Sequence, residues 1–509
     1  MVALAVLLTT WAACPLLDHN DPPEPAFTVL LDGAPKSIDP RFATSDFSVK
    51  LSKLVFSGLV TIDTPDGQPE LDLATRIDLV GDTTYEITLR DDAVWHDGDP
   101  VTAHDVHWTF TTLGDVKSPY AGLGERIKRL EVRDDHHLTI ELTEPHAPFM
   151  TNLAMGIVPR HAVDKEGMMA EDALVGSGPF RWEARSGQSW VALTAHDQYH
   201  GGRPALDRVV FRVLPDDNTR LLAMLGGEAD LVQNATAPLM LPVFDDAREV
   251  EFESAPSFKY TYLAFNLEHE ILGDVRVRKA IAHTIDRARI IKEKFRGTAR
   301  PARGILAPEH WAYEPDVRTY ALDLDRARAL LDEAGYPDPE GPEPRFTITL
   351  KTTTNKFRRS VAELFSIELA KVGIEVKVRA YEWGTFFGDV KSRNFDMYSM
   401  QWPSVVEPDL MAWIFHSNSI PTADSRSRGA NRGAYRNAEV DKYLDEGRRA
   451  LDRTDRKRAY GEVQRRLAED LPYVPLWHED NLVLRKKGVR GYKILPNARF
   501  RHLADTHVD

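Results

Sequence analysis

The sequence predicts an α/β protein of two or three domains, and three observations lead to this prediction. The chain has 509 residues, more than one hydrophobic core usually organises. Apolar residues make up 42% of the chain and charged residues 28%, a composition typical of globular proteins. Strand-like and helix-like segments alternate in the second half, as they do in α/β domains. The net charge of −14 and the lack of a basic block argue against a nucleic-acid partner.

Strands dominate the predicted first half. Apolar–polar alternation or short apolar runs predict strands at 27–31, 84–90, 137–142, 190–194, 208–214 and 227–232. The Asp-Gly pair at 66–67 predicts a tight hairpin turn, because these residues adopt positive φ values easily. Helices are predicted at 46–59 and 217–226, and Thr102 and Asp105 form the capping box of a third helix.

The centre of the chain combines one strand with one long helix. Alternating residues predict a half-buried strand at 260–266, with Tyr260 and Tyr262 on the same face. Apolar residues at helical spacing then predict a single amphipathic helix over 275–295, with Asp274 as its N-cap. Past this centre, helices are predicted at 325–334, 357–372, 438–451 and 455–469, and strands at 346–350 and 374–380.

The first 25 residues have the pattern of an export signal followed by a tether. An apolar run ends in Ala12 and Ala13 directly before Cys14, the one cysteine of the chain, and a polar, proline-rich stretch follows. This arrangement resembles the lipobox of a bacterial lipoprotein, in which the thiol carries a diacylglyceryl group. Trp11 departs from the aliphatic residue usual there, and the alternative is an export signal with an incidental cysteine. The run is too short to span a bilayer, so we expect an exported protein without a disulfide.

Two groups of residues invite a metal-site or catalytic interpretation. His104 and His107 lie one helical turn apart and His96 is near in sequence, but no carboxylate or cysteine completes a ligand set at regular spacing. Exposed helix histidines are the preferred interpretation. Ser177 lies between two glycines without the Gly-x-Ser-x-Gly pattern of a nucleophile elbow, so we predict a tight turn there.

Several motifs match, in order, those of one protein family. They are His96-Asp-Gly-x-Pro-x-Thr-Ala-x-Asp-Val106, Gly176-Ser-Gly-Pro-Phe180, Gly227-Glu-Ala-Asp230, Phe265-Asn266, Val277-Arg-x-Ala-Ile281 and Gly433-x-Tyr-x-Asn437. With these motifs the chain resembles family 5 extracellular solute-binding proteins, from about Phe27 to about Leu503. These are the dipeptide, oligopeptide and nickel receptors of ABC importers. The common order of the motifs carries the resemblance, more than any single one.

The resemblance implies a two-lobed periplasmic-binding-protein fold of type II, in its large peptide-binding class, with a third domain added to the first lobe. The expected divisions are 1–25 for signal and tether, 26–55 and 173–262 for lobe I, 56–172 for the additional domain, 263–478 for lobe II, and 479–509 for the return to lobe I. Residues 260–266 would then cross between the lobes. The lobes would close on a small-molecule solute and present it to an ABC permease and its ATPase. The resemblance further implies a monomer without a cofactor, in the periplasm or at the cell surface.

Peptide-binding members of this family hold the ammonium of the peptide with an aspartate that lies between a Trp and an acidic-Pro pair. The matching run here is Met400-Gln-Trp-Pro-Ser-Val-Val-Glu-Pro-Asp409, so the position falls on Ser404 or Val405 and the aspartate is missing. Burying an ammonium without an anion costs several kcal/mol. A free peptide N-terminus is therefore expected to bind poorly, unless Glu407 or Asp409 reaches inward.

The resemblance also implies which side chains line the pocket. Trp383 matches a pocket tryptophan and Trp402 lies close to another, while a place in the core is the alternative for both. The full set of expected ligand contacts is Trp383, Trp402, Ser404, Glu407, Gln401, Tyr260, Tyr262 and Phe42. Aromatic faces beside amide and hydroxyl groups suit a peptide held by its backbone or a neutral sugar.

Other functions stay open beside a peptide receptor. One is an oligosaccharide receptor, and another is a nickel-type receptor for a metal chelate, which the 17 histidines suggest. A third is a glycoside-cleaving enzyme that would use Glu407 and Asp409 as paired carboxylates. No nucleophile–base set or cofactor loop accompanies these carboxylates, so the preferred prediction is a receptor without catalytic or metal-binding residues.

Overall fold

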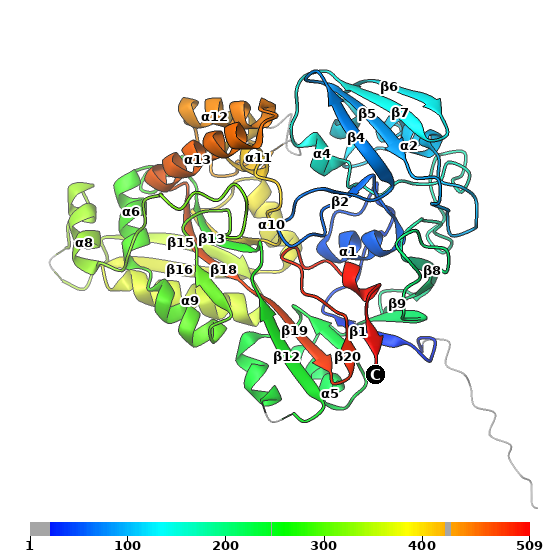
Figure 1. Ribbon diagram of the computed structural model, residues 1–509. Helices are drawn as coiled ribbons and strands as arrows, with labels where there is room; N and C mark the ends of the chain where they lie inside the picture. The colour runs from blue at the N-terminus through cyan, green and yellow to red at the C-terminus, as the bar shows by residue number, and fades with distance from the viewer. Residues whose placement is uncertain (1–20, 246, 340, 423–428) are drawn as a thin grey trace, which may run out of the picture.

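The computed structural model describes residues 21–509 except 246, 340 and 423–428, and it shows two lobes and an additional domain (Figure 1). The predicted lipidation site, Cys14, lies outside the described residues. Lobe I contains a seven-stranded sheet, lobe II a six-stranded sheet, and the additional domain a four-stranded sheet. Within the described residues, each helix is too short or too polar to traverse a bilayer.

Lobe I is built around strand β1, at the middle of a sheet with the order β12-β19-β11-β1-β10-β9-β8. Its strands are β1 Phe27–Leu31, β8 Phe180–Ser186, β9 Trp190–Ala195, β10 Arg208–Val213, β11 Leu231–Gln233, β12 Val250–Ala255 and β19 Asn481–Lys486. All of β1 is buried, because helices cover both faces of the sheet. Helix α1 (Asp46–Val55) packs on the face of Val29, and α5 (Asp217–Leu225) packs on the face of Leu30. Helix α1 ends at Val55, earlier than predicted, because Phe56 is extended.

Lobe II is built on a mixed sheet with the order β14-β18-β13-β17-β15-β16. Its strands are β13 Tyr260–Phe265, β14 Ala299–Pro301, β15 Phe346–Thr353, β16 Ile374–Tyr381, β17 Met397–Trp402 and β18 Tyr473–Glu479. The prediction of a half-buried strand at 260–266 is wrong, since every residue of β13 is buried.

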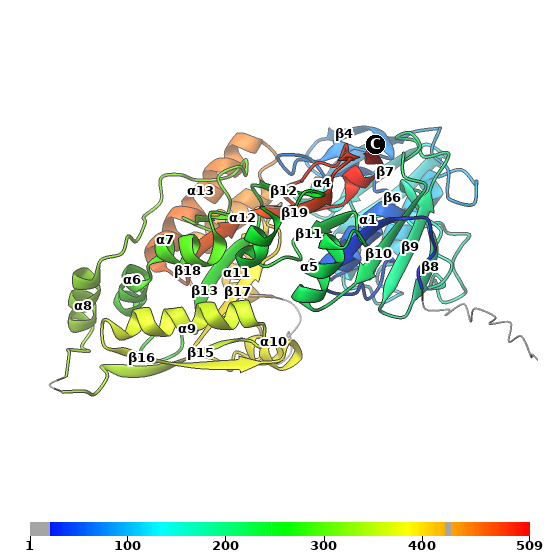
Figure 2. The ribbon, with the colours of Figure 1, turned by 90° about the horizontal axis from the view of Figure 1, so that it is seen from below.

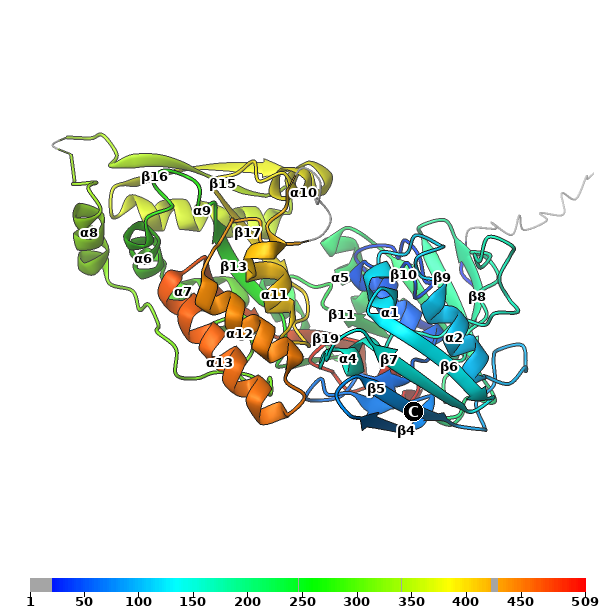
Figure 3. The ribbon, with the colours of Figure 1, turned by 90° about the horizontal axis from the view of Figure 1, so that it is seen from above.

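Helices on both sides of this sheet explain the burial of β13 (Figures 2 and 3). One face packs against α6 Val275–Thr284, α8 Leu324–Glu333 and α9 Lys356–Ala370. The other face packs against α10 Trp383–Lys391, α11 Leu410–Phe415, α12 Ala438–Arg449 and α13 Arg453–Asp470. The predicted helices at 325–334, 357–372, 438–451 and 455–469 are thus confirmed to within a few residues.

The single helix predicted over 275–295 is wrong, because the chain breaks after α6. Ile285 is extended, with φ −79° and ψ 114°, and Asp286 caps a new helix, α7 (Arg287–Ile290). A π-helical turn, Ile291–Phe295, follows. Aspartate favours the N-cap position because its side chain accepts a hydrogen bond from a free backbone N–H of the first turn, at 2.9 Å here.

The additional domain has its own antiparallel sheet, with the order β4-β5-β7-β6. Its main elements are β4 Ala74–Val80, β5 Thr84–Leu89, α2 Ala103–Thr111, α3 Ala121–Gly124, β6 Ile127–Asp134, β7 His137–Leu142 and α4 Phe149–Asn152. The remaining short strands are β2 Val60–Thr61, β3 Glu70–Leu71, β20 Val489–Arg490 and β21 His507–Val508, and the 3₁₀ turns are Pro238–Phe244, Ser417–Ser419 and Arg501–Leu503. The capping box predicted for α2 is present, with the Thr102 N–H donating to Asp105 at 3.0 Å.

The chain passes between the lobes at two short crossings. Residues 256–259 join β12 to β13, and Asp480 alone joins β18 to β19. The strand predicted to cross at 260–266 therefore lies entirely in the sheet of lobe II. Because the expected boundary at 262/263 would divide this strand, we place the boundary at 256–259. The two crossings touch, since Nζ of Lys259 donates to the carbonyl oxygen of Asp480 at 3.2 Å.

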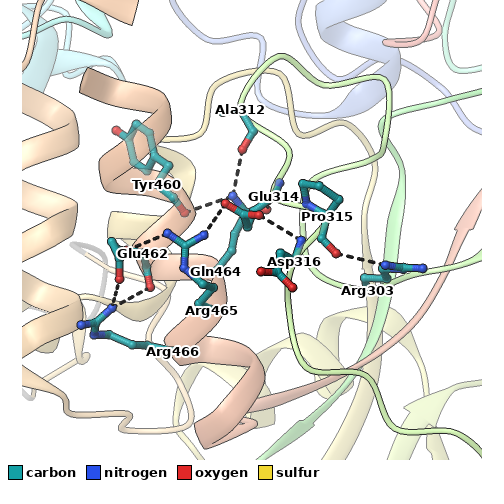
Figure 4. A network of polar contacts seen from close by, with 10 residues as sticks. All are labelled: Arg303, Ala312, Glu314, Pro315, Asp316, Tyr460, Glu462, Gln464, Arg465 and Arg466. Atoms are coloured by element: carbon teal, nitrogen blue, oxygen red, sulfur yellow. Dashed lines mark hydrogen bonds and ion pairs between the residues drawn. The ribbon is translucent and has the colours of Figure 1, made fainter. Parts of the chain in front are cut away.

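A long irregular segment between β14 and α8 is attached to α13 by several side chains, among them the buried Gln464 (Figure 4). Nε2 of Gln464 donates to the carbonyl oxygens of Ala312 at 2.9 Å and Tyr460 at 3.0 Å. Its Oε1 accepts the N–H of Glu314 at 3.3 Å. Gln464 is buried, so these bonds replace water for backbone groups that a loop would otherwise leave unpaired.

Candidate ligand-binding cleft

A cavity of about 310 Å³ lies between the two lobes. Lobe I supplies the residues after β1, part of α1 and the turn after β11, while lobe II supplies the ends of β17 and β18 and the first turn of α9. Cavities of this size and larger hold small-molecule ligands in proteins.

The edge of the lobe II sheet at this cavity is the one where its parallel strands end. β15 pairs in parallel with β16 and with β17, so all three strands end at the same edge. Helix α9 begins directly after β15, and the Asn355 side chain caps it by accepting the N–H of Arg358 at 3.1 Å. In open α/β sheets this edge is where ligands bind, because the loops that follow the strands leave a crevice.

The wall formed by lobe I carries three carboxylates. Asp46 pairs with Lys50 at 2.6 Å, and Asp217 pairs with Arg220. Among the described residues, the Asp32 side chain has no hydrogen-bond or ion-pair partner. The enclosing walls raise the pKa of Asp32 through loss of hydration, and the positive charge of Arg220 opposes this.

The wall formed by lobe II carries Lys259, Glu479 and Arg358. Burial lowers the pKa of Lys259 to about 8, with Glu479 acting in the opposite direction. The Glu479 carboxylate accepts hydrogen bonds from the Thr261 hydroxyl at 2.9 Å and the Trp477 indole at 3.3 Å. The Arg358 guanidinium has no acceptor among the described residues.

The predicted ligand residues at the end of β17 lie at or next to this edge. Gln401 lines the cavity, and its Nε2 donates to the Thr261 hydroxyl at 3.1 Å. Trp402 is half-buried and meets Trp413 edge-to-face at 5.9 Å. Among the described residues, neither the Trp402 indole N–H nor the Ser404 hydroxyl has a hydrogen-bond partner, although both atoms are buried.

Trp383 lies at the start of α10, beyond the end of β16, and is 55% exposed. Its ring stacks on Phe387 at 5.1 Å, and the Arg432 guanidinium lies over the Phe387 ring at 4.9 Å. A tryptophan this exposed is not a core residue, so the core alternative for Trp383 is wrong.

Three predicted aromatic contacts lie away from the cleft, which corrects those predictions. Tyr260 and Tyr262 are 2% and 0% exposed and pack in the core under α10–α13, where Tyr262 stacks on Tyr473 at 4.2 Å. They alternate on one face of β13, and that face is covered by helices. Phe42 lines a separate small cavity next to Met169 in lobe I.

Glu407 and Asp409 also point away from the cleft. Glu407 pairs with Arg456 and accepts a hydrogen bond from Thr151 of the additional domain at 3.0 Å. Asp409 pairs with Arg448 at 3.0 Å. Burial raises the pKa of both carboxyl groups, and the arginines oppose the rise. Neither carboxylate is therefore free to hold a ligand ammonium.

The histidines predicted as a conceivable metal set do not lie together. His96 is buried, where Nδ1 accepts the N–H of Gly176 and Nε2 meets the carbonyl oxygen of Gly178, both at 3.1 Å. Burial lowers the pKa of His96 to about 3. This histidine instead holds the segment around Ser177 in place. The predicted tight turn is absent at Ser177 itself, and the chain bends one residue later, at 178–179. Among the described residues, the one group that could hold a metal ion is a different, exposed set: Asp97, Asp99 and His161.

The chain matches the family model of bacterial extracellular solute-binding proteins, family 5, over residues 68–421. This chain belongs to that family. A relative in Bacillus subtilis (strain 168), the oligopeptide-binding protein AppA, is 28% identical over 492 residues, covering 91% of this chain and 88% of the relative. The dipeptide-binding protein of Escherichia coli (strain K12) is 26% identical over 501 residues, covering 91% of both chains.

Solved structures agree with this family assignment. AppA from Bacillus subtilis in complex with a nonapeptide superposes with a TM-score of 0.81 at 26% identity, over 95% of this chain and 98% of that one. NikZ from Campylobacter jejuni in complex with Ni(L-His) superposes with a TM-score of 0.84 at 23% identity, over 94% of this chain and 99% of that one. At such identity the second likeness shows the fold alone. This protein therefore has the two-lobed fold of type II solute-binding proteins.

The charged residues of the cleft were missed by sequence reasoning. Asp32, Lys259 and Arg358 stand on three different segments, so no local pattern links them. Asp32 directly follows a buried strand and Arg358 lies in the first turn of a helix after another strand. The presence of polar residues directly after predicted strands could have pointed to the cleft, because the strands of a parallel sheet end at a common edge.

Proposed function

We propose that this protein captures a small polar solute, foremost a short peptide, between its lobes and delivers it to a membrane ABC permease. The observation that carries this proposal is the cavity between the lobes, which has one wall from each lobe and lies at the ends of parallel strands. The family assignment and the peptide-binding relatives support it.

Closure of the lobes is the proposed mechanism. A ligand that touches both walls stabilises the closed form by its differential affinity for that form. The two crossings at 256–259 and Asp480 are short, so a change of a few backbone dihedrals there can rotate one lobe against the other. The permease and its ATPase would recognise the closed, loaded protein, and no covalent bond of the solute would change.

Gln401, Trp402, Ser404 and Trp383 remain the proposed ligand contacts from the predicted set. The unpaired hydroxyl of Ser404 and indole N–H of Trp402 support this proposal, because buried polar atoms normally have a hydrogen-bond partner. The exposed face of Trp383 offers a flat apolar surface at the same edge. A neutral oligosaccharide is the second candidate, since such aromatic faces suit sugar rings as well.

Calorimetry of the purified full-length protein tests the proposal with three probes: a tryptic peptide mixture, a mixture of neutral oligosaccharides, and Ni(II). Binding heat without product formation, together with a smaller radius of gyration in solution scattering, supports a closing receptor. Turnover of any probe, or no binding to any of them, contradicts it. Selective binding of Ni(II) would replace the peptide assignment with a metal-chelate receptor.

We also propose that Cys14 carries the lipid anchor that holds the protein at the outer side of the membrane. Its support is the sequence pattern around this residue. Metabolic labelling with palmitate in a bacterial host should mark the wild-type chain and not the Cys14→Ser variant. Equal labelling of both would remove the assignment.

A further inference from the structure

Lobe II contains a second cavity, of about 390 Å³, compared with about 310 Å³ for the ligand-binding cleft. This lobe II cavity lies between the break after α6, at residues 285–288, the end of β14 at 301–303 and the irregular segment at 318–322. The end of α13 and the start of β18 complete its lining. Within the described part of the chain no residue lines both this cavity and the cleft, so the two are separate.

Hydrogen bonds within the protein fix the walls of the lobe II cavity. The Tyr320 hydroxyl donates to the carbonyl oxygen of Ala468 at 2.8 Å. The Asp323 N–H donates to the carbonyl oxygen of His283 at 2.9 Å, and His283 Nδ1 lies 2.8 Å from the carbonyl oxygen of Ala321. These bonds join the irregular segment to α13 and to α6. The cavity is therefore preformed, as small-molecule sites in proteins usually are.

Apolar side chains supply much of the lining of the lobe II cavity. Among them are Ala302, Leu471, Val474 and Pro475. Leu322 lines the cavity as well and is 48% exposed, which is unusual for a leucine beside a packed sheet. A ligand with an apolar body would remove this surface from water, which is favourable.

Positive charge is in excess among the charged residues of this lining. Arg287, Arg303 and Arg318 stand against one lining carboxylate, that of Asp286. Glu469 pairs with Arg318 at 3.2 Å, so the two carboxylates leave one positive charge over. Arg303 forms no ion pair with a described carboxylate, and its guanidinium donates to one backbone carbonyl at 3.0 Å. The cavity therefore favours a ligand with a single negative charge.

The half-buried Arg287 has unused hydrogen-bonding capacity. Among the residues that the structure describes, its guanidinium has one acceptor, the carbonyl oxygen of Ala282 at 3.3 Å. Loss of hydration lowers the pKa of Arg287 and of Arg278 on α6 to about 10. Arg278, by contrast, donates to the backbone carbonyls of Leu272, Gly273, Asp470 and Leu471. Asp286 acts on the charge of Arg287, but its carboxylate already caps α7. Since polar groups that lose water normally gain acceptors, a ligand oxygen is the acceptor that Arg287 lacks.

From these observations we propose that the lobe II cavity is a second binding site, which takes a small carboxylate with an apolar body, such as a medium-chain fatty acid. The carboxylate would accept N–H groups of Arg287, because a guanidinium matches a carboxylate in geometry and charge. The apolar body would cover Leu322 and the apolar part of the lining. Inorganic phosphate fits less well, since it carries more charge and has no apolar body. The site lies apart from the cleft and does not depend on the proposed transport function.

Calorimetry of the full-length protein tests this proposal with octanoate, its neutral analogue octanamide and inorganic phosphate. We expect one octanoate per chain, and at least tenfold weaker binding of octanamide and of phosphate. Arg287→Gln should weaken octanoate binding at least tenfold. Leu322→Asp should do the same by adding a carboxylate at an exposed position of the lining, and it keeps the test valid if Arg287→Gln does not fold. Leu71→Asp, in the additional domain, is the matched control: Leu71 is 50% exposed, and octanoate affinity should not change.

Four results would overturn the proposal. The first is the absence of octanoate binding, and the second is binding of octanamide or phosphate as tight as that of octanoate. The third is an octanoate affinity that Leu322→Asp leaves unchanged. The fourth is displacement of octanoate by the tryptic peptide mixture, which would place it in the cleft. Each of these results removes the lobe II site and leaves the proposed receptor function untouched.

Discussion

The ion pair between Glu407 and Arg456 allows a prediction whose size follows from the structure. Arg456→Met leaves the Glu407 carboxylate in the same place without its cation, and Thr151 remains its one side-chain donor. Breaking a fully buried pair costs about 3–5 kcal/mol, and we expect about 2–3 kcal/mol because these side chains keep 11% and 19% of their exposure. Loss of the contact between the guanidinium and the Trp311 ring, 5.1 Å away, adds about 0.5–1 kcal/mol.

Thermal unfolding followed by circular dichroism measures this loss. A total of about 3 kcal/mol lowers the midpoint by about 6–12 °C, since about 1 kcal/mol corresponds to 2–4 °C in domains of 150–250 residues. Arg453→Met is the matched control, because Arg453 contacts the same Trp311 ring but forms no ion pair with a described residue. It should lose about 0.5–1 kcal/mol.

The pH dependence separates the charge effect from lost packing. Burial holds the pKa of Glu407 above its ordinary value of 4.5 in the folded state, so the folded state binds the proton more tightly than the unfolded state. Stability due to this group therefore falls as pH rises from 4.5 through the folded-state pKa. Without Arg456 that pKa rises further, so the deficit of Arg456→Met should be largest at neutral pH and shrink towards pH 4.5. Adding Glu407→Gln should remove this dependence, and a deficit independent of pH in Arg456→Met alone would refute the reasoning.

Three further predictions concern the segment at Gly176, the irregular segment between β14 and α8, and the ligand-binding cleft. Gly176→Ala should prevent folding or lower the thermal midpoint by more than 10 °C, because a Cβ there would lie 1.9 Å from the Val55 carbonyl oxygen. Gly304→Ala is the control: its Cβ would meet open space, so the thermal midpoint should change little. Gln464→Ala should lower the free energy of unfolding in urea by about 2–3 kcal/mol, because it leaves buried backbone groups unpaired. It should also speed amide hydrogen exchange of the segment around Glu314. Unchanged exchange there would contradict this role of Gln464. Trp383→Ala should keep the wild-type thermal midpoint, because the ring is 55% exposed, and it should weaken peptide binding about tenfold in calorimetry. A lower midpoint with unchanged affinity would make the ring structural.

Local signals in the sequence predicted most regular elements of lobe II. Four helices and two strands lie within a few residues of their predicted positions: α8, α9, α12, α13, β15 and β16. The helices have N-capping residues, and the strands have short runs of β-branched and apolar residues. The break after α6 was missed although its signal was present: Asp286 can cap a new helix as well as continue an old one. Strands β17 and β18 were not predicted, since aromatic, histidine and proline residues obscure their period.

The site was harder to predict than the fold, and Tyr262 shows the reason. Its alternation on β13 was read correctly, but the sequence could not say whether that face meets solvent, a ligand or a helix. Gln401 does line the cavity, and it was singled out because the run from Met400 to Asp409 resembles the ligand loop of the family. Asp32, Lys259 and Arg358 become neighbours of one cavity through the pairing of distant segments, which local patterns do not encode.

Lys259 connects the chemistry of the cleft to the motion proposed for the lobes. It lies in one crossing, and its Nζ donates to the backbone carbonyl of Asp480, which is the other crossing. Lys259 lines the cavity, and its ammonium group has three N–H donors, of which this carbonyl accepts one. An ion pair with a ligand is stronger than a bond to a neutral carbonyl. A bound anion would therefore form an ion pair at the point where the two crossings meet, which couples ligand charge to lobe closure through a single side chain.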